Sequence, residues 1–299
     1  MQPLRPVHRV CYAWRMNLPP EFDPAIYHDL HADLAHMDDA MLEQHYHSYG
    51  RAEGRVSSNI DNRMAFVGLV GPDISALEIA PFVTPLLRGG NTFYYDAFGE
   101  DRQRQHAIDY GYNPDDVPHM DYTGSLDDVP RTFQAVLSSH VIEHQPDLIG
   151  HLVQVEHRLE RGGRYFIVIP DKRYCFDRFN APSTIADIVE AHEERRTVHS
   201  LKSLITYQAL RVHNEPAKHW AEKDLRPPTA DPAKITEAVQ MWRSSNGAYL
   251  DTHGWYFTPD TFRENIDLTV RLGLTSLSIE RLYSTPYGSN EFWTVLRKS

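Results

Sequence analysis

The sequence predicts an α/β fold built on a doubly wound, mostly parallel sheet. Residues 134–139 and 163–169 contain short apolar runs bounded by turn residues, which is typical of strands buried on both faces. Between them, leucine and valine recur at helical spacing from Leu148 to Leu159, and Gly162-Gly163 is expected to end that helix. The resulting strand–helix–strand unit is the repeating element of this fold class.

The other elements follow the same alternation from about residue 65 onward. Before this unit, strands are expected at 75–79, 92–96 and 118–121; after it, a helix is expected at 259–272 and strands at 275–283 and 290–297. Residues 171–255 interrupt the alternation with helical patterns separated by prolines, at 184–192, 200–212 and 232–244. We interpret this stretch as a helical insertion after the fifth strand, at the edge where parallel α/β sheets bind ligands.

Residues 1–60 are predicted to form a small helical appendage, and residues 61–299 to form the α/β domain. Asp23-Pro24 is a typical helix start, and apolar residues follow it at helical spacing as far as Leu34. A second amphipathic helix is expected from Met41 to Tyr49, with Gly50 at its end.

Composition argues against several classes of protein. A net charge of -11 opposes a nucleic-acid partner, because such binding depends on Lys and Arg replacing counterions. No apolar run approaches the length of a membrane span. Two cysteines cannot form a disulfide framework and no secretion signal opens the chain, so a cytoplasmic protein is expected. The sequence does not indicate an oligomeric state.

Three segments resemble the class I methyltransferases that depend on S-adenosylmethionine (SAM), of the methyltransferase type 11 kind. Residues 75–82, Ser-Ala-Leu-Glu-Ile-Ala-Pro-Phe, are similar to the family's first strand and cofactor turn, and residues 92–96 are similar to its second strand, which ends in an acid. Residues 139–144, Ser-His-Val-Ile-Glu-His, resemble the turn after the fourth strand. The resemblance implies a seven-stranded Rossmann-like sheet with an antiparallel last strand, SAM as cofactor, and methyl transfer to an acceptor.

The resemblance also implies where SAM is held. Glu78 would order the turn around the methionine end of SAM, and Asp96 would accept hydrogen bonds from the ribose hydroxyls. The other residues of the implied cofactor site are Ala80, Pro81, Phe82, Asp121 at the adenine edge, and Ser138 and Ser139 at the methionine end. Most members of the family carry glycine in the first turn, which allows positive φ, whereas residues 80–85 contain none.

The motif His140-x-x-Glu143-His144 has three interpretations. Inverted zinc peptidases carry His-x-x-Glu-His on a continuous helix, which Pro146 opposes here. Some SAM methyltransferases carry Glu-x-x-Glu-His at this turn and bind a divalent metal; His140, Glu143 and His144 would favour zinc, iron or manganese over magnesium. A fourth ligand would come from the insertion, where the candidates are His199, His213, His219 and His253.

In the third interpretation, Glu143 and His144 fix the turn through hydrogen bonds, while His140 contacts SAM or the acceptor. His140 is then the candidate catalytic base, because a hydroxyl acceptor must lose a proton and imidazole can take it near neutral pH. Asp171, just beyond the next strand, is the competing base.

Residues of the insertion indicate the kind of acceptor. Lys172 and Arg173 favour a small anionic acceptor, such as a carboxylated sugar or a phosphosugar. His219, His253 and Trp255 combine hydrogen-bonding groups with an aromatic ring, as sugar sites often do.

Residues 1–60 resemble a short module found beside glycosyltransferase and methyltransferase domains of surface-polysaccharide pathways. The similar residues are Phe22-Asp23-Pro24 and His45-Tyr46-x-x-Tyr49-Gly50-Arg51. This resemblance implies O-methylation of a sugar or glycan intermediate. Two alternatives stay open: a non-catalytic SAM-fold binding protein and a His-x-x-Glu-His metallohydrolase.

Overall fold

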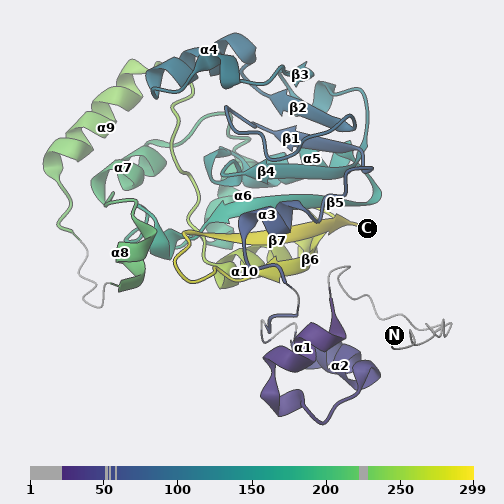
Figure 1. The fold of residues 1–299 in the computed structure, drawn as a ribbon. Coiled ribbons are helices and arrows are strands. Elements are labelled where there is room, and N and C mark those ends of the chain that lie inside the picture. The colour runs from purple at the N-terminus through teal and green to yellow at the C-terminus, as the bar shows by residue number, and fades with distance from the viewer. Residues whose placement is uncertain (1–21, 51–52, 54, 58, 222–227) are drawn as a thin grey trace. The chain divides into compact units, whose positions relative to one another are not determined.

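The chain divides into two units, Met1–Asn59 and Ile60–Ser299, one residue from the boundary expected from the sequence (Figure 1). The computed structural model describes residues 22–50, 53, 55–57, 59–221 and 228–299. Each unit has a hydrophobic core of its own.

A seven-stranded sheet is the frame of the larger unit, with the strand order β3-β2-β1-β4-β5-β7-β6 (Figure 1). The strands are β1 (Ala76–Ile79), β2 (Thr92–Asp96), β3 (Tyr122–Thr123), β4 (Phe133–Ser139), β5 (Leu159–Pro170), β6 (Leu277–Tyr283) and β7 (Glu291–Lys298). The first five strands pair in parallel, whereas β7 runs antiparallel to both β5 and β6. This is the Rossmann-like sheet that the resemblance implies, so the predicted fold class is confirmed.

Both faces of the sheet are covered, because successive residues of a strand point to opposite sides. On one face, Tyr165 and Ile167 of β5 belong to a core shared with α5 and α10. On the other face, Phe166 and Val168 pack with Phe66 of α3 and with β7. The helices outside the insertion are α3 (Arg63–Val67), α4 (Glu100–Asp109), α5 (Leu148–Arg158) and α10 (Pro259–Arg271). Among the helices that the structure describes, none is long and apolar enough to cross a membrane.

The insertion adds further helices to this unit. They are α6 (Ile185–Glu193), α7 (Leu201–Ala209), α8 (Pro216–Ala221) and α9 (Pro232–Ser244), of which α8 was not expected from the sequence. Ile188 and Ala191 of α6 are buried in the main core, so the insertion is part of the domain and not a linker.

The third strand is not where the sequence predicts it. β3 covers only Tyr122–Thr123, instead of residues 118–121. Val117 and Met120 fill a small apolar cluster with Ala107 of α4, and this burial replaces strand pairing for that stretch.

The predicted helix stop at Gly162-Gly163 is also wrong. α5 ends at Arg158 and β5 begins at the next residue. A Cβ at Gly163 would be 2.9 Å from the carbonyl oxygen of Glu160 in β5 itself and 3.2 Å from that of Gln134 in the neighbouring strand β4. This glycine therefore serves strand pairing.

The N-terminal unit is a helical body around aromatic side chains. Asp23 caps α1 (Pro24–Leu30) by accepting hydrogen bonds from N–H groups of the first turn, so the predicted helix start is confirmed. α2 (Asp39–His45) ends before the expected Tyr49 and continues as a π-helical turn over Tyr46–Gly50. The core of this unit consists of Tyr27, Leu34, Leu42 and Tyr46. Arg51, part of the pattern that resembles the polysaccharide-pathway module, lies outside the described residues.

Candidate functional site

A cavity of about 550 Å³ lies at the carboxyl edge of β1, β2 and β4. Ala80 and Phe82 in the turn after β1 line it, together with Asp96 at the end of β2 and His140 after β4. Residues of α4 and residues 249–251 of the insertion complete the lining. Doubly wound sheets bind ligands at this edge, so the cavity is the candidate active site.

The turn after β1 has a glycine-like backbone without glycine. Ala80 has φ 53° and Phe82 has φ 48°, both in the left-handed region. The buried carboxylate of Glu78 orders this turn, since it accepts hydrogen bonds from the N–H groups of Leu86 (2.9 Å) and Leu87 (2.8 Å). Burial raises the pKa of Glu78 to about 7. Glu78 therefore acts on the turn and does not itself line the cavity.

Asp96 is a buried carboxylate in the cavity lining. Its Oδ1 accepts a hydrogen bond from the N–H of Phe98 at 2.7 Å, and its Oδ2 accepts one from the side-chain amide of Gln103 at 2.7 Å. Burial raises the pKa of this carboxyl group. Each carboxylate oxygen has a second lone pair, so Asp96 retains the capacity to accept hydrogen bonds from a ribose diol.

Besides Glu78, four residues of the expected cofactor site do not line the cavity: Pro81, Asp121, Ser138 and Ser139. Asp121 precedes β3 instead of ending it, and its Oδ2 accepts a hydrogen bond from the N–H of Tyr94 at 2.8 Å. The hydroxyl of Ser138 is buried 2.7 Å from the hydroxyl of Tyr165. The expected contacts of these residues with SAM stay predictions. For Ser138, the alternation of side chains along β4 directs the hydroxyl away from the cavity.

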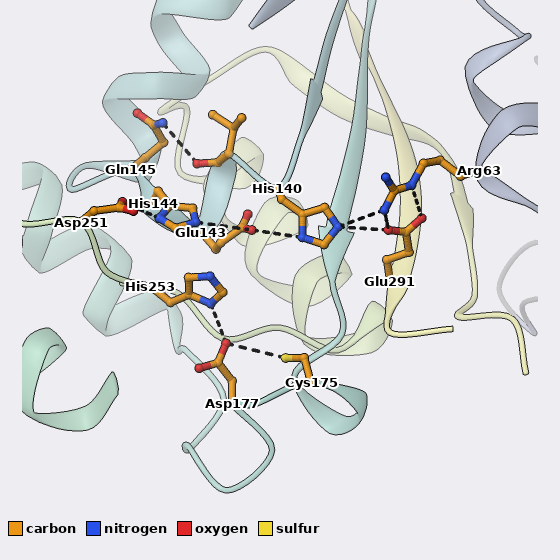
Figure 2. Close-up of polar contacts among 11 residues, drawn as sticks. Arg63, His140, Glu143, His144, Gln145, Cys175, Asp177, Asp251, His253 and Glu291 are labelled. Carbon is orange, nitrogen blue, oxygen red and sulfur yellow. Dashed lines mark hydrogen bonds and ion pairs between the residues drawn. The ribbon is translucent and has the colours of Figure 1, made fainter. Parts of the chain in front are cut away.

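His140 lies between two carboxylates (Figure 2). Its Nε2 is 3.0 Å from Oε2 of Glu291, and its Nδ1 is 3.6 Å from Oε1 of Glu143. Glu291 also pairs with Arg63. Burial alone would raise the pKa of Glu291, but hydrogen bonds from His140 and Arg63 outweigh it and lower that pKa to about 2. Glu291 is therefore an ionised partner that orients the imidazole of His140.

Reasoning from the sequence missed both Glu291 and Arg63. Glu291 opens β7, and because β7 is antiparallel, its first residue lies at the edge where the parallel strands end. An acid directly before the mostly apolar run Phe-Trp-Thr-Val-Leu at residues 292–296 is the signal that could have identified it. Other lining residues that were missed are Phe98, Gln103, His151 and Tyr249.

Another cluster, which lies beside His140 and Glu291, consists of Glu143, His144 and His253 (Figure 2). One potential ligand atom from each residue lies within 4.8 Å of the others. The Glu143 carboxylate is buried, and neither of its oxygens has a hydrogen-bond partner among the described residues. Nδ1 of His144 is 2.8 Å from Asp251, and Nδ1 of His253 is 2.6 Å from Asp177. Two imidazoles and a carboxylate are suitable donors for a divalent metal.

The backbone excludes a single helix through the His140-x-x-Glu143-His144 motif. β4 ends before His140, a 3-10 helix covers only Ile142–His144, and α5 begins at Leu148. The interpretation as an inverted zinc peptidase is therefore wrong. Of the predicted metal ligands, the structure groups Glu143 and His144 with His253, which was one of the candidates for a fourth ligand, and His140 is outside this group.

The three residues after β5 do not line the cavity. The buried carboxylate of Asp171 binds the guanidinium of Arg173 (2.6 Å) and the hydroxyl of Thr285 (2.6 Å). The amino group of Lys172 donates to the carbonyl oxygen of Arg178 at 2.8 Å. These contacts oppose the expected roles of Asp171 as a base and of Lys172 and Arg173 as acceptor ligands, which stay predictions.

His219 and Trp255 also lie outside the lining. Nε2 of His219 is 2.9 Å from the carbonyl oxygen of His213, and the indole N–H of Trp255 donates to the carbonyl oxygen of Gln145 at 2.6 Å. Both side chains stabilise backbone segments, and their expected contact with an acceptor stays a prediction. Of the candidate ligands in the insertion, His199, His213 and His219 are outside the cluster that contains His253.

No protein-family model and no curated protein sequence matches the chain. Among solved structures, it is similar to the CcbJ methyltransferase from Streptomyces caelestis, with 9% identity, coverage of 79% of this chain and 93% of that chain, and a TM-score of 0.39. It is also similar to a structure from Rhodobacter sphaeroides described as a Zn-dependent alcohol dehydrogenase (12% identity, 82% and 92% coverage, TM-score 0.43).

A third similar structure is the glycopeptide N-methyltransferase MtfA complexed with sinefungin. The identity is 17%, the coverage is 36% of this chain and 51% of that chain, and the TM-score is 0.27. The match thus spans about half the length of MtfA. Likenesses this distant carry no argument about function, and the fold assignment depends on the strand order and strand directions.

Proposed function

We propose that this protein is a SAM-dependent methyltransferase that methylates a hydroxyl group of a small acceptor, a sugar or glycan intermediate. The observation that carries the proposal is the cavity at the carboxyl edge of the sheet, where the turn after β1, Asp96 and His140 meet. Nucleoside cofactors bind at this edge in doubly wound sheets.

The residues present fit SAM. Asp96 would accept hydrogen bonds from the ribose hydroxyls. Ala80 and Phe82 would bring the backbone of the first turn to the ligand, since their left-handed conformations reproduce the turn that glycine normally forms. SAM supplies a methyl group on a positively charged sulfur, and its transfer depends mainly on positioning the acceptor in line.

His140 is proposed as the base that takes the proton of the acceptor hydroxyl. The ionised carboxylate of Glu291 can only accept hydrogen bonds, so it fixes the proton of His140 on Nε2 and leaves the lone pair of Nδ1 free. The ionised carboxylate of Glu291, 3.0 Å from Nε2, would stabilise the imidazolium that forms.

The acceptor is proposed as a neutral hydroxyl compound. Lys172 and Arg173, which had favoured an anionic acceptor, do not line the cavity. The assignment to a sugar or glycan depends on the resemblance of residues 1–60 to a module of polysaccharide pathways, which is an argument by association. It therefore needs its own test.

Calorimetry of the full chain with SAM tests the cofactor. We expect binding in a one-to-one ratio and strong weakening in Asp96→Ala. Asp101→Ala is the matched control, because Asp101 is exposed on α4 and outside the lining. No detectable binding to the unchanged chain would overturn the proposal.

Transfer of an isotope-labelled methyl group from SAM to a panel of acceptors tests the substrate. The panel would contain neutral sugars, uronic acids, nucleotide sugars and small phenols. Labelling of neutral sugar hydroxyls is expected. Labelling of phenols alone would overturn the sugar assignment while leaving methyl transfer intact.

A further inference from the structure

We propose that Glu143, His144 and His253 bind one divalent transition-metal cation in the wall of the cavity. His144 itself lines the cavity, so the site borders the space for the acceptor. The binding claim is independent of the proposed function. The role of the cation, which is to hold an oxygen atom of the acceptor next to His140, rests on that function.

Glu143 is a buried carboxylate without a hydrogen bond. Its side chain is 1% exposed, and both oxygens lack a hydrogen-bond partner among the residues described. The imidazole nitrogens beside it, Nδ1 of His140 at 3.6 Å and Nε2 of His144 at 3.9 Å, lie beyond hydrogen-bonding distance. Buried carboxylates are costly unless they are paired or coordinate a metal. A cation would supply the missing contacts.

Both histidines of the cluster are oriented by separate carboxylates. Asp251 holds Nδ1 of His144, and Asp177 holds Nδ1 of His253. Figure 2 shows the other nitrogen of His253 directed toward Glu143 and His144. At metal sites, a carboxylate on one ring nitrogen commonly fixes the tautomer and the ring orientation, leaving the other nitrogen for the metal.

The ligand types select the kind of cation. Two imidazoles with one carboxylate favour Zn²⁺, Mn²⁺ or Fe²⁺, whereas Mg²⁺ prefers oxygen ligands. Three protein ligands are also the usual set of catalytic zinc sites, which keep a position open for water or substrate. His140 is not required as a ligand, because its Nε2 is engaged by Glu291 and its Nδ1 serves as the proposed base.

The experiment uses the full chain after treatment with a chelator and removal of the chelator. Calorimetric titration should show one tight equivalent of Zn²⁺ and much weaker binding of Mg²⁺. Co²⁺ in place of Zn²⁺ should give visible absorption bands typical of nitrogen and oxygen ligands. Glu143→Gln and His253→Ala should lose the tight equivalent in both measurements. Asp177→Asn should weaken the affinity about 10–100-fold.

Matched variants distinguish binding at this site from unspecific binding of the metal by other histidines, of which the chain has 17 in all. His106→Ala removes a histidine that lines the cavity but lies outside the cluster, and it should keep the tight equivalent. Glu143→Gln preserves side-chain size and replaces a buried carboxyl group that makes no hydrogen bond, so it is expected to fold, which thermal unfolding verifies. Tight binding that survives in Glu143→Gln, equal loss in His106→Ala, or no tight binding at all would each overturn the proposal.

Asp96→Ala separates this inference from the proposed function. It should lose SAM and keep the cation. A chain that binds the cation but not SAM would sustain the metal site and overturn the methyltransferase proposal. A chain that binds SAM but no cation would sustain the cofactor assignment and overturn the metal site.

Discussion

Ala80, Phe82 and His140 share a left-handed backbone, and all three line the cavity. Among the described residues, the other non-glycine residues with positive φ are Arg195 and Asn246. This conformation costs a residue with a Cβ about 1–2 kcal/mol, and it persists only where the surrounding structure enforces it. Three of these strained residues lie around one cavity. The backbone there is therefore shaped by the positions that these residues take around the cavity, at a cost in stability.

Ala80→Gly should raise the free energy of unfolding by up to about 1 kcal/mol. Relief of about 1–2 kcal/mol of backbone strain exceeds the entropic cost of glycine, about 0.5–1 kcal/mol. Urea unfolding measures the change. Ala107→Gly is the control, because Ala107 is buried in α4 and its φ is not positive. Its free energy of unfolding should fall by about 1 kcal/mol or more. An equal loss in both variants would contradict the assignment of strain.

His140→Ala should lower kcat about 10²–10⁴-fold and change the dissociation constant of SAM far less. The reason is that a base acts on the acceptor proton in the transition state, not on the bound cofactor. Glu291→Gln should lower kcat by a smaller factor and leave KM for SAM nearly unchanged, because Glu291 positions the base. Steady-state kinetics and SAM calorimetry separate the two effects. Unchanged turnover in His140→Ala would remove His140 from the mechanism.

Glu78 should make the stability of the fold depend on pH. Its pKa in the folded chain is about 7, above the ordinary value of 4.5, because burial disfavours the charged form. A raised folded pKa contributes stability that is complete below the unfolded value and is lost as the pH rises through the folded value. Glu78→Gln should therefore flatten the decline in stability between about pH 4.5 and 7, by on the order of 3 kcal/mol.

Urea unfolding across this pH range measures the Glu78 contribution. The absolute stability of Glu78→Gln falls as well, because the amide offers one acceptor oxygen to two backbone N–H groups. The diagnostic quantity is thus the slope of the free energy of unfolding against pH. The same slope in both proteins would show that Glu78 does not titrate in this range.

β5 depends on a close approach of strands that glycine permits. A Cβ at position 163 would meet two backbone oxygens, at 2.9 Å and 3.2 Å. Gly163→Ala should therefore lower the free energy of unfolding by about 1–3 kcal/mol, as overpacking does. Gly90→Ala is the control, since no heavy atom lies within 4 Å of its added Cβ and its φ is not positive. Equal urea midpoints for the two variants would contradict this account.

Helices and strands with an apolar pattern were predictable, and those without one were not. β4 and β5 each contain a short apolar run, and α5 has a periodic apolar face, so all three were expected, although β5 begins at Leu159 instead of residue 163. α4 is almost entirely polar, with only Gln103 and Ala107 buried, and it gave no periodic signal. β3 has two residues and is too short to show alternation.

The candidate site joins segments that are far apart in the chain. Asp96, Glu143 and His140 could be proposed from the sequence because each lies beside the carboxyl end of a strand. Arg63 could not, because it reaches His140 only after α3 has packed. Glu291 could be found only from the acid that opens the last strand. Position along the chain also suggested Asp171 as a site residue, because it follows the end of a strand. In the structure, its carboxylate pairs with Arg173.

Hydrophobic periodicity and turn residues were sufficient to specify the fold class, the edge of the sheet that binds ligands, and an insertion beside that edge. These features arise from local burial, which neighbouring residues encode. The pairing of charges was apparent only in the folded chain: Arg173 lies with Asp171, Glu291 lies with His140, and Glu143 lies without a hydrogen bond beside His144 and His253. Such pairing depends on distances between remote segments, and packing sets those distances.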